Sequence, residues 1–113
     1  MITSKLLIAI LGPKYTEIKE DNSLLVCTEF GWQKFNGKKY PEGLNLHELA
    51  NKCKIWAYEN GYIISTEIAC KDKFNSTVKS LHRSIVCLDS DKYEYEAIFK
   101  SGEFILNLIK DES

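Results

Sequence analysis

A histidine and several nucleophilic side chains lie close together in the stretch 80–87. His82 is flanked by Ser80 and Ser84, and Cys87 follows five residues after it. A histidine that activates a cysteine is the pair on which thiol hydrolases depend. In a strand, however, His82 and Cys87 point to opposite faces, and a five-residue spacing also matches one face of a helix poorly. The spacing therefore assigns no catalytic residue, and a small Cys/His enzyme is the third of three functional interpretations.

No spacing typical of a metal or cofactor site occurs in the sequence. His47 and Glu48 match the start of the zinc motif H-E-x-x-H, but residue 51 is asparagine. The acidic stretch 89–96 lacks the central glycine and the length of a calcium-binding loop. Neither glycine-rich phosphate-binding motif is present, because the six glycines fall singly along the chain. We therefore expect no metal and no cofactor.

The cysteines are typical of buried free thiols. Cys27, Cys53, Cys70 and Cys87 lie in apolar segments, without a C-x-x-C pair. A thiol in such a segment behaves as a small hydrophobic side chain, so we expect four reduced cysteines in a cytoplasmic protein. The longest apolar run, Leu6–Leu11, is far shorter than the roughly 20 residues that span a bilayer. We expect no membrane association.

The strongest candidate binding surface is the segment 31–40, in which aromatic and lysine side chains occur without any acid. Asn36-Gly37 predicts a type I′ turn, which would join strands at 32–35 and 38–40 into a hairpin. Aromatic rings beside lysines are typical of surfaces that bind single-stranded nucleic acid, and aromatic anchors are typical of protein interfaces. In the purely structural alternative, one face of the hairpin lies in the core and lysines line its rim. The candidate binding residues are Trp32, Lys34, Phe35, Lys38, Lys39 and Tyr40.

Charge is distributed unevenly, although 15 basic and 16 acidic residues leave a net charge of −1. Residues 31–54 carry five lysines and two glutamates, residues 71–83 are also basic, and residues 89–113 are acidic. Charged surroundings of aromatic anchors steer protein encounters. We therefore interpret the chain as a non-catalytic interaction domain that binds a protein partner or itself through the hairpin. Binding of single-stranded nucleic acid by the same surface is the alternative.

The length of 113 residues is suited to a single domain over 1–113. A composition of 44% hydrophobic and 27% charged residues excludes a disordered chain and a coiled coil. Frequent lysine, isoleucine and asparagine are typical of small proteins of microbes and their mobile elements.

Every local signal predicts a helix over about 45–60. Asn45 is a favourable N-cap with Glu48 three positions later, and Gly61 follows as a stop residue. The apolar residues repeat at three-to-four spacing and form one face: Leu46, Leu49, Ala50, Cys53, Trp56 and Ala57.

Most of the remaining chain predicts strands separated by polar turns. We expect strands at 4–11, 15–19, 24–30, 62–70, 85–88 and 93–99, with a polar loop at 71–76 and turns at 89–92 and 101–102. The stretches 77–84 and 103–110 fit a helix or a strand. The predicted fold is α+β, a mostly antiparallel sheet of about five to seven strands with one central amphipathic helix packed on one face.

Overall fold

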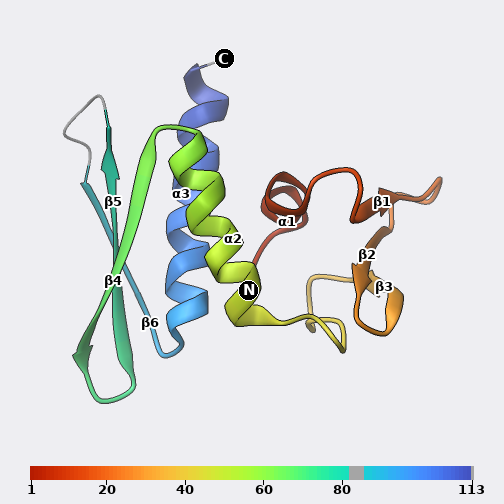
Figure 1. The fold of residues 1–113 in the computed structure, drawn as a ribbon, viewed down its shortest axis with the longest axis horizontal. Helices are drawn as coiled ribbons and strands as arrows, with labels where there is room; N and C mark the ends of the chain where they lie inside the picture. Colours follow the sequence, from red (N-terminus) through yellow and green to blue (C-terminus); the bar gives the residue numbers. More distant parts are fainter. Residues whose placement is uncertain (82–85, 113) are drawn as a thin grey trace.

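The computed structural model describes residues 1–81 and 86–112, and the side chains of residues 1–81 and 89–111. Over these residues the chain forms three helices and six strands (Figure 1). In chain order they are α1 (Ser4–Leu11), β1 (Thr16–Ile18), β2 (Leu24–Thr28), β3 (Gly31–Phe35), α2 (Leu46–Glu59), β4 (Tyr62–Cys70), β5 (Lys73–Ser80), β6 (Val86–Asp91) and α3 (Glu94–Glu112).

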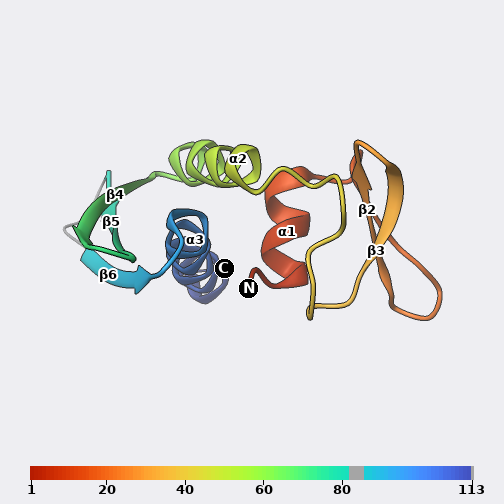
Figure 2. The same cartoon turned by 90° about the horizontal axis from the view of Figure 1, so that it is seen from below.

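The α+β class is confirmed, but the expected single large sheet around one helix is wrong. The strands form two separate antiparallel sheets of three strands each, in the orders β1-β2-β3 and β4-β5-β6. Seen from below, α1 lies between the first sheet and the pair formed by α2 and α3 (Figure 2). The described part of the chain therefore uses three helices, each of which contributes to the core.

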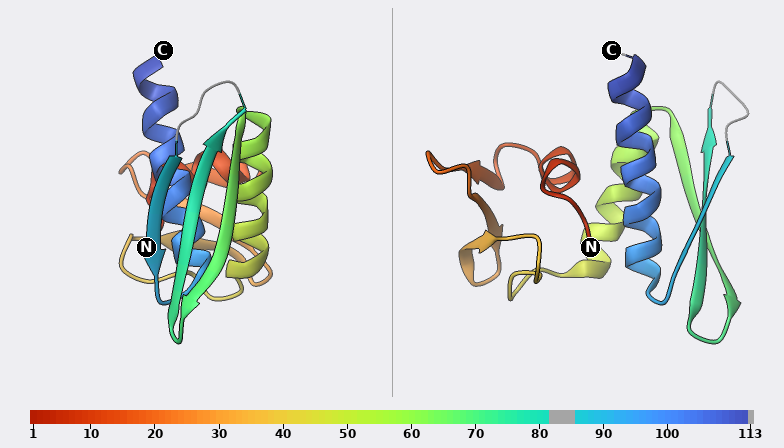
Figure 3. Two further views of the ribbon diagram at one scale, coloured as in Figure 1. Left: turned by 90° about the vertical axis from the view of Figure 1, so that its left-hand side faces the viewer. Right: turned by 180° about the vertical axis from the view of Figure 1, so that it is seen from behind.

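The helices α2 and α3 cover one face of the sheet β4-β5-β6 (Figure 3). Alternate residues of the strands point towards them, so Tyr62, Ile64 and Val78 are buried. Between β5 and α3 the hydroxyls of Ser76 and Ser101, both fully buried, form a hydrogen bond of 2.7 Å. The two helices run in the same direction, so their N-terminal ends lie together (Figure 1).

One face of the sheet β1-β2-β3 packs towards α1, the N-terminal helix. Leu24, Val26 and Phe35 belong to the same buried cluster as Leu6 and Leu7 of α1. That cluster continues into α2 and α3, so one hydrophobic core joins the two sheets.

The helix predicted over about 45–60 is confirmed as α2. The side chain of Asn45 accepts a hydrogen bond of 3.0 Å from the Glu48 backbone N–H, as an N-cap does. The helix ends at Glu59, and its buried residues include Leu49 and Cys53. Local capping and apolar periodicity both specify this element, which explains the agreement.

The strand expected at 4–11 is wrong, because this apolar run forms α1. The hydroxyl of Thr3 accepts the Leu6 backbone N–H, and the Gly12 N–H donates to the Ile8 carbonyl. A short apolar run has the same appearance in a buried strand and in a buried helix. The capping residues at its two ends distinguish the helix.

The hairpin expected around Asn36-Gly37 is also wrong. The strand β3 pairs with β2, in the register Leu24↔Phe35 to Thr28↔Gly31, and residues 38–40 form no strand. The Asn36 side chain instead accepts hydrogen bonds from the Lys38 and Lys39 backbone N–H groups. This local turn satisfies the backbone without a second strand.

The strand expected at 93–99 and the turn at 101–102 are wrong, because both lie in α3. Alternation of aromatic residues suggested a strand, but Ala97, Ile98 and Phe99 are all buried. The buried stripe continues at Ser101 and Ile105, which is helical spacing. Among the described helices, none has the length and apolar content to cross a membrane.

The strand predicted at 62–70 is confirmed as β4, whereas the polar loop expected at 71–76 is largely wrong. The strand β5 begins at Lys73, which leaves Lys71 and Asp72 as a tight turn. The acidic stretch expected to form the turn at 89–92 instead belongs to β6 up to Asp91. Residue 85, the start of the strand expected at 85–88, lies outside the described residues.

Candidate functional site

The three aromatic residues of the predicted binding surface do not share one face. Trp32 on β3 is 49% exposed, whereas Phe35 is 4% exposed in the core. The half-buried Tyr40 hydroxyl donates to the Glu96 carboxylate and accepts the Ile2 backbone N–H. Burial and this hydrogen bond raise the pKa of Tyr40 above its usual range. Of the three, only Trp32 presents its ring to solvent.

The three predicted lysines are all exposed but belong to two different segments. Lys34 lies two residues after Trp32 on β3, so both side chains point to the same face of the sheet. Lys38 and Lys39 lie in the turn that Asn36 organises. A binding role for the six predicted residues stays a prediction.

The cysteines have three different environments. Cys53 is buried, Cys27 is half-buried, and Cys70 is exposed at the end of β4, so the expectation of four buried thiols is wrong. Burial, with a smaller effect of the Glu103 carboxylate, raises the pKa of Cys53 to about 12. His82 and the Cys87 side chain lie outside the described residues. Over the residues that are described, no three metal-ligating side chains gather.

Phe30, which lies at the turn of the β2–β3 hairpin near Trp32, is an exposed aromatic residue that the sequence prediction missed. Its side chain is 69% exposed. The Thr28 hydroxyl accepts the Phe30 N–H at 3.1 Å and donates to the Gly31 carbonyl at 2.9 Å, which ends the strand before Phe30. Threonine followed three positions later by glycine is the signal that marks this turn.

Phe30 and Trp32 both adjoin residues that line a pocket. A Cβ added to Gly43 would lie 2.9 Å from Cδ2 of Phe30, so the ring packs directly on this glycine. Trp32 stands opposite Cys27 in the β2–β3 register, and paired residues point to the same face of a sheet. Gly43 and Cys27 both belong to the pocket lining.

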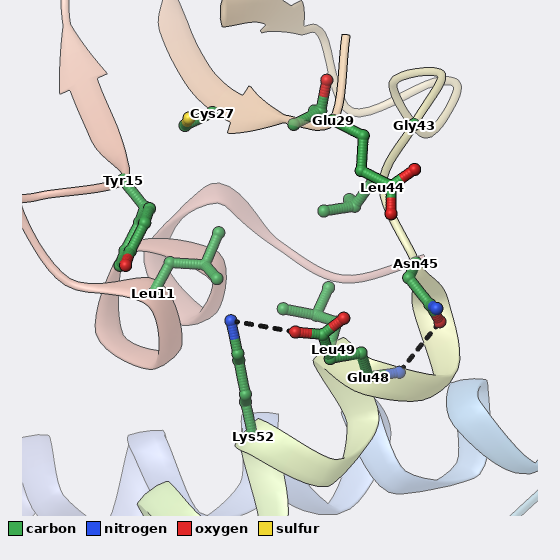
Figure 4. Close-up of a pocket in the computed structure, with 11 residues that line it drawn as sticks. Leu11, Tyr15, Cys27, Glu29, Gly43, Leu44, Asn45, Glu48, Leu49 and Lys52 are labelled. Carbon is green, nitrogen blue, oxygen red and sulfur yellow. Dashed lines mark hydrogen bonds and ion pairs between the residues drawn. The ribbon is translucent and has the colours of Figure 1, made fainter. Parts of the chain in front are cut away.

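The pocket, of about 280 Å³, lies between the end of β2, the end of α1 and the start of α2 (Figure 4). Aliphatic side chains from three segments extend into it, namely Leu11, Leu44 and Leu49. The remaining lining residues are Tyr15, Cys27, Thr28, Glu29, Gly43, Asn45, Glu48 and Lys52.

The charged groups of the pocket leave one carboxylate without a cation. Lys52 Nζ lies 3.5 Å from Glu48 Oε1 and 5.6 Å from the centre of the Tyr15 ring. Glu29 extends from the end of β2 towards Leu44 (Figure 4). Within residues 1–81 and 89–111, Glu29 forms no ion pair. The lining thus has a net negative charge.

We call the surface formed by Glu29, Phe30, Trp32 and Leu44 the hairpin face, and the buried Leu49 lines its pocket. Exposed aromatic side chains beside an apolar hollow are typical of binding surfaces. Comparison of the chain with protein-family models, with curated proteins and with solved structures gives no match.

Proposed function

We propose that this chain is a non-catalytic interaction module that binds a segment of a partner protein on the hairpin face. The observation that supports the proposal is the exposure of Phe30 (69%) and Trp32 (49%) beside the pocket. Large aromatic side chains are enriched at the centres of protein interfaces. Covering them removes apolar surface from water, which contributes roughly 25 cal/mol per Å².

The charges favour a protein partner over nucleic acid at this face. Glu29 and Glu48 line the pocket, and only Lys52 among the lining residues is basic. Carboxylates repel phosphate groups, whereas binding of single-stranded nucleic acid depends on basic side chains along the strand. Lys34 shares the face of Trp32, so the basic charge lies on β3 and the excess acidic charge lies at the pocket.

The test selects peptides from a phage-displayed library of random sequences on the immobilised protein. The variant F30A/W32A removes both exposed rings. Its matched control is I55A/Y58A, because Ile55 (51%) and Tyr58 (64%) are equally exposed on α2 and lie outside the hairpin face. Since all four side chains are largely exposed, we expect both variants to fold, which unchanged circular dichroism checks.

We expect peptides enriched on the wild type to lose binding to F30A/W32A and to keep it with I55A/Y58A. Equal binding to F30A/W32A would contradict the proposal. Light scattering of the wild type and of F30A/W32A shows whether the partner is a second copy. Oligothymidine binding that weakens steeply from about 50 to 200 mM salt would support nucleic acid instead.

A further inference from the structure

We infer that the pocket of the hairpin face receives an arginine side chain of the partner protein, with its guanidinium at the Glu29 carboxylate. This inference rests on the proposed function and names the residue that the interaction module selects.

The walls of the pocket fit the aliphatic part of such a side chain. Leu11, Leu44 and Leu49 come from α1, from the loop before α2 and from α2 itself, and they extend into the same space (Figure 4). The volume of about 280 Å³ has room for one such side chain.

The electrostatics of the pocket favour a cation beside Glu29. Lys52 already neutralises Glu48 at 3.5 Å, so the charge that remains is the carboxylate of Glu29. The Glu48 backbone N–H at the start of α2, a donor that an anion could otherwise use, is already bonded to Asn45. A long cationic side chain therefore complements both the walls and the charge.

The position of Phe30 favours arginine over lysine. Its exposed ring packs on Gly43, which lines the pocket, and Phe30 follows Glu29 in the chain. A guanidinium group donates two parallel hydrogen bonds to a carboxylate and stacks on an aromatic ring. The lysine ammonium lacks the planar fork and gains less from both partners.

The test is an NMR titration of the ¹⁵N-labelled protein with n-butylguanidinium, which reproduces the arginine side chain without a peptide. We expect amide shifts at Glu29, Gly43, Leu44 and Leu49, with a dissociation constant on the order of 1 mM for so small a ligand. Butylammonium is expected to bind more weakly, and pentanoate not to shift these amides.

The variant E29Q removes the charge and keeps the shape, and we expect it to weaken butylguanidinium binding at least about threefold. E67Q is the matched control, because Glu67 is exposed on β4. Absent pocket shifts, equal binding of pentanoate, or unchanged affinity in E29Q would each overturn the inference. If butylguanidinium binds as expected and the library yields no peptide, the pocket assignment stands and the interaction function fails.

Discussion

Cys53 Sγ lies 2.7 Å from the point that a Cβ would occupy on Gly102, so the helices α2 and α3 touch where α3 has no side chain. Leu6 of α1 approaches the same point, with its Cδ2 at 3.0 Å. The three helices therefore meet at Gly102, and α1 carries the sheet of the hairpin face onto the rest of the fold. The small residue is required by this close approach.

Substitution of this glycine is expected to destabilise the protein although it sits within a helix. Alanine gains about 1 kcal/mol of helix propensity, but overpacking of a closed core costs about 1–3 kcal/mol. We expect the free energy of unfolding of Gly102→Ala, measured in urea, to fall by about 1 kcal/mol. Asn107→Ala on the exposed side of α3 is the control and should not destabilise. A G102A variant as stable as N107A would contradict the contact.

Because the Cys53 thiol is buried at the same junction, we expect the free energy of unfolding to decrease at alkaline pH. The pKa of Cys53 is about 12 in the folded protein, against 9.0 for a free thiol. The folded state thus keeps a proton that the unfolded state releases, so stability is complete below about pH 9 and is lost as pH rises towards 12.

We expect Cys53 to account for about 1 kcal/mol of lost unfolding free energy between about pH 8 and pH 10. Urea titrations of the wild type and of Cys53→Ala at both pH values measure it, since the variant lacks this part of the loss. Cys70→Ala, at an exposed position, should keep the full pH dependence. An equal pH dependence in C53A and the wild type would show that Cys53 does not cause it.

The same junction explains which elements the sequence predicts and which it does not. The helix α2 is predictable because its N-cap Asn45, its apolar stripe and its C-cap Asn60 all act locally. Ser101 and Gly102 are typical of a turn when only their neighbours in sequence are considered. In the fold they are small because Ser76, Cys53 and Leu6 pack against them. Tertiary contacts thus decide α3.

The candidate site was only partly predictable for a similar reason. The exposure of Trp32 agrees with a binding surface, but the partner strand of β3 precedes it in the chain and buries Phe35. Phe30 leaves the strand because Thr28 forms a local turn. The pocket joins α1, β2 and α2, and no local pattern shows that these segments meet.

The buried hydroxyl pair between β5 and α3 gives a third prediction. Ser76 and Ser101 are each 0% exposed and bond to one another at 2.7 Å. Loss of one partner leaves the other hydroxyl unpaired, which costs about 1–3 kcal/mol. Ser101→Ala is expected to cost more than Ser76→Ala, because a helical serine hydroxyl can turn to the carbonyl four residues earlier.

A double-mutant cycle in urea separates this hydrogen bond from changes in packing. We expect S76A/S101A to be more stable than the sum of the two single effects predicts, by about 1 kcal/mol. Strict additivity would mean that the hydroxyls do not depend on each other. The pair Ser65→Ala and Asn107→Ala, at exposed positions on the outer face of β4 and on α3, is the control cycle and should be additive because the two sites do not touch.

The wall of the pocket gives the last prediction, because two glycines with nearly equal φ angles differ in their surroundings. Gly43 has a φ of +80° and Gly37 a φ of +78°. A Cβ at Gly43 would lie 3.2 Å from the Phe30 backbone N, whereas a Cβ at Gly37 would meet nothing within 4 Å. Both alanine variants bear the cost of a left-handed residue, about 1 kcal/mol. Only Gly43→Ala also displaces Phe30, so we expect its unfolding free energy in urea to fall by at least about 1 kcal/mol more than that of Gly37→Ala.

The same two variants also differ in ligand binding. Butylguanidinium should cause smaller shifts of the pocket amides in G43A than in the wild type, and shifts of wild-type size in G37A. Equal losses of stability in the two variants would show that Phe30 does not rest on Gly43 in solution.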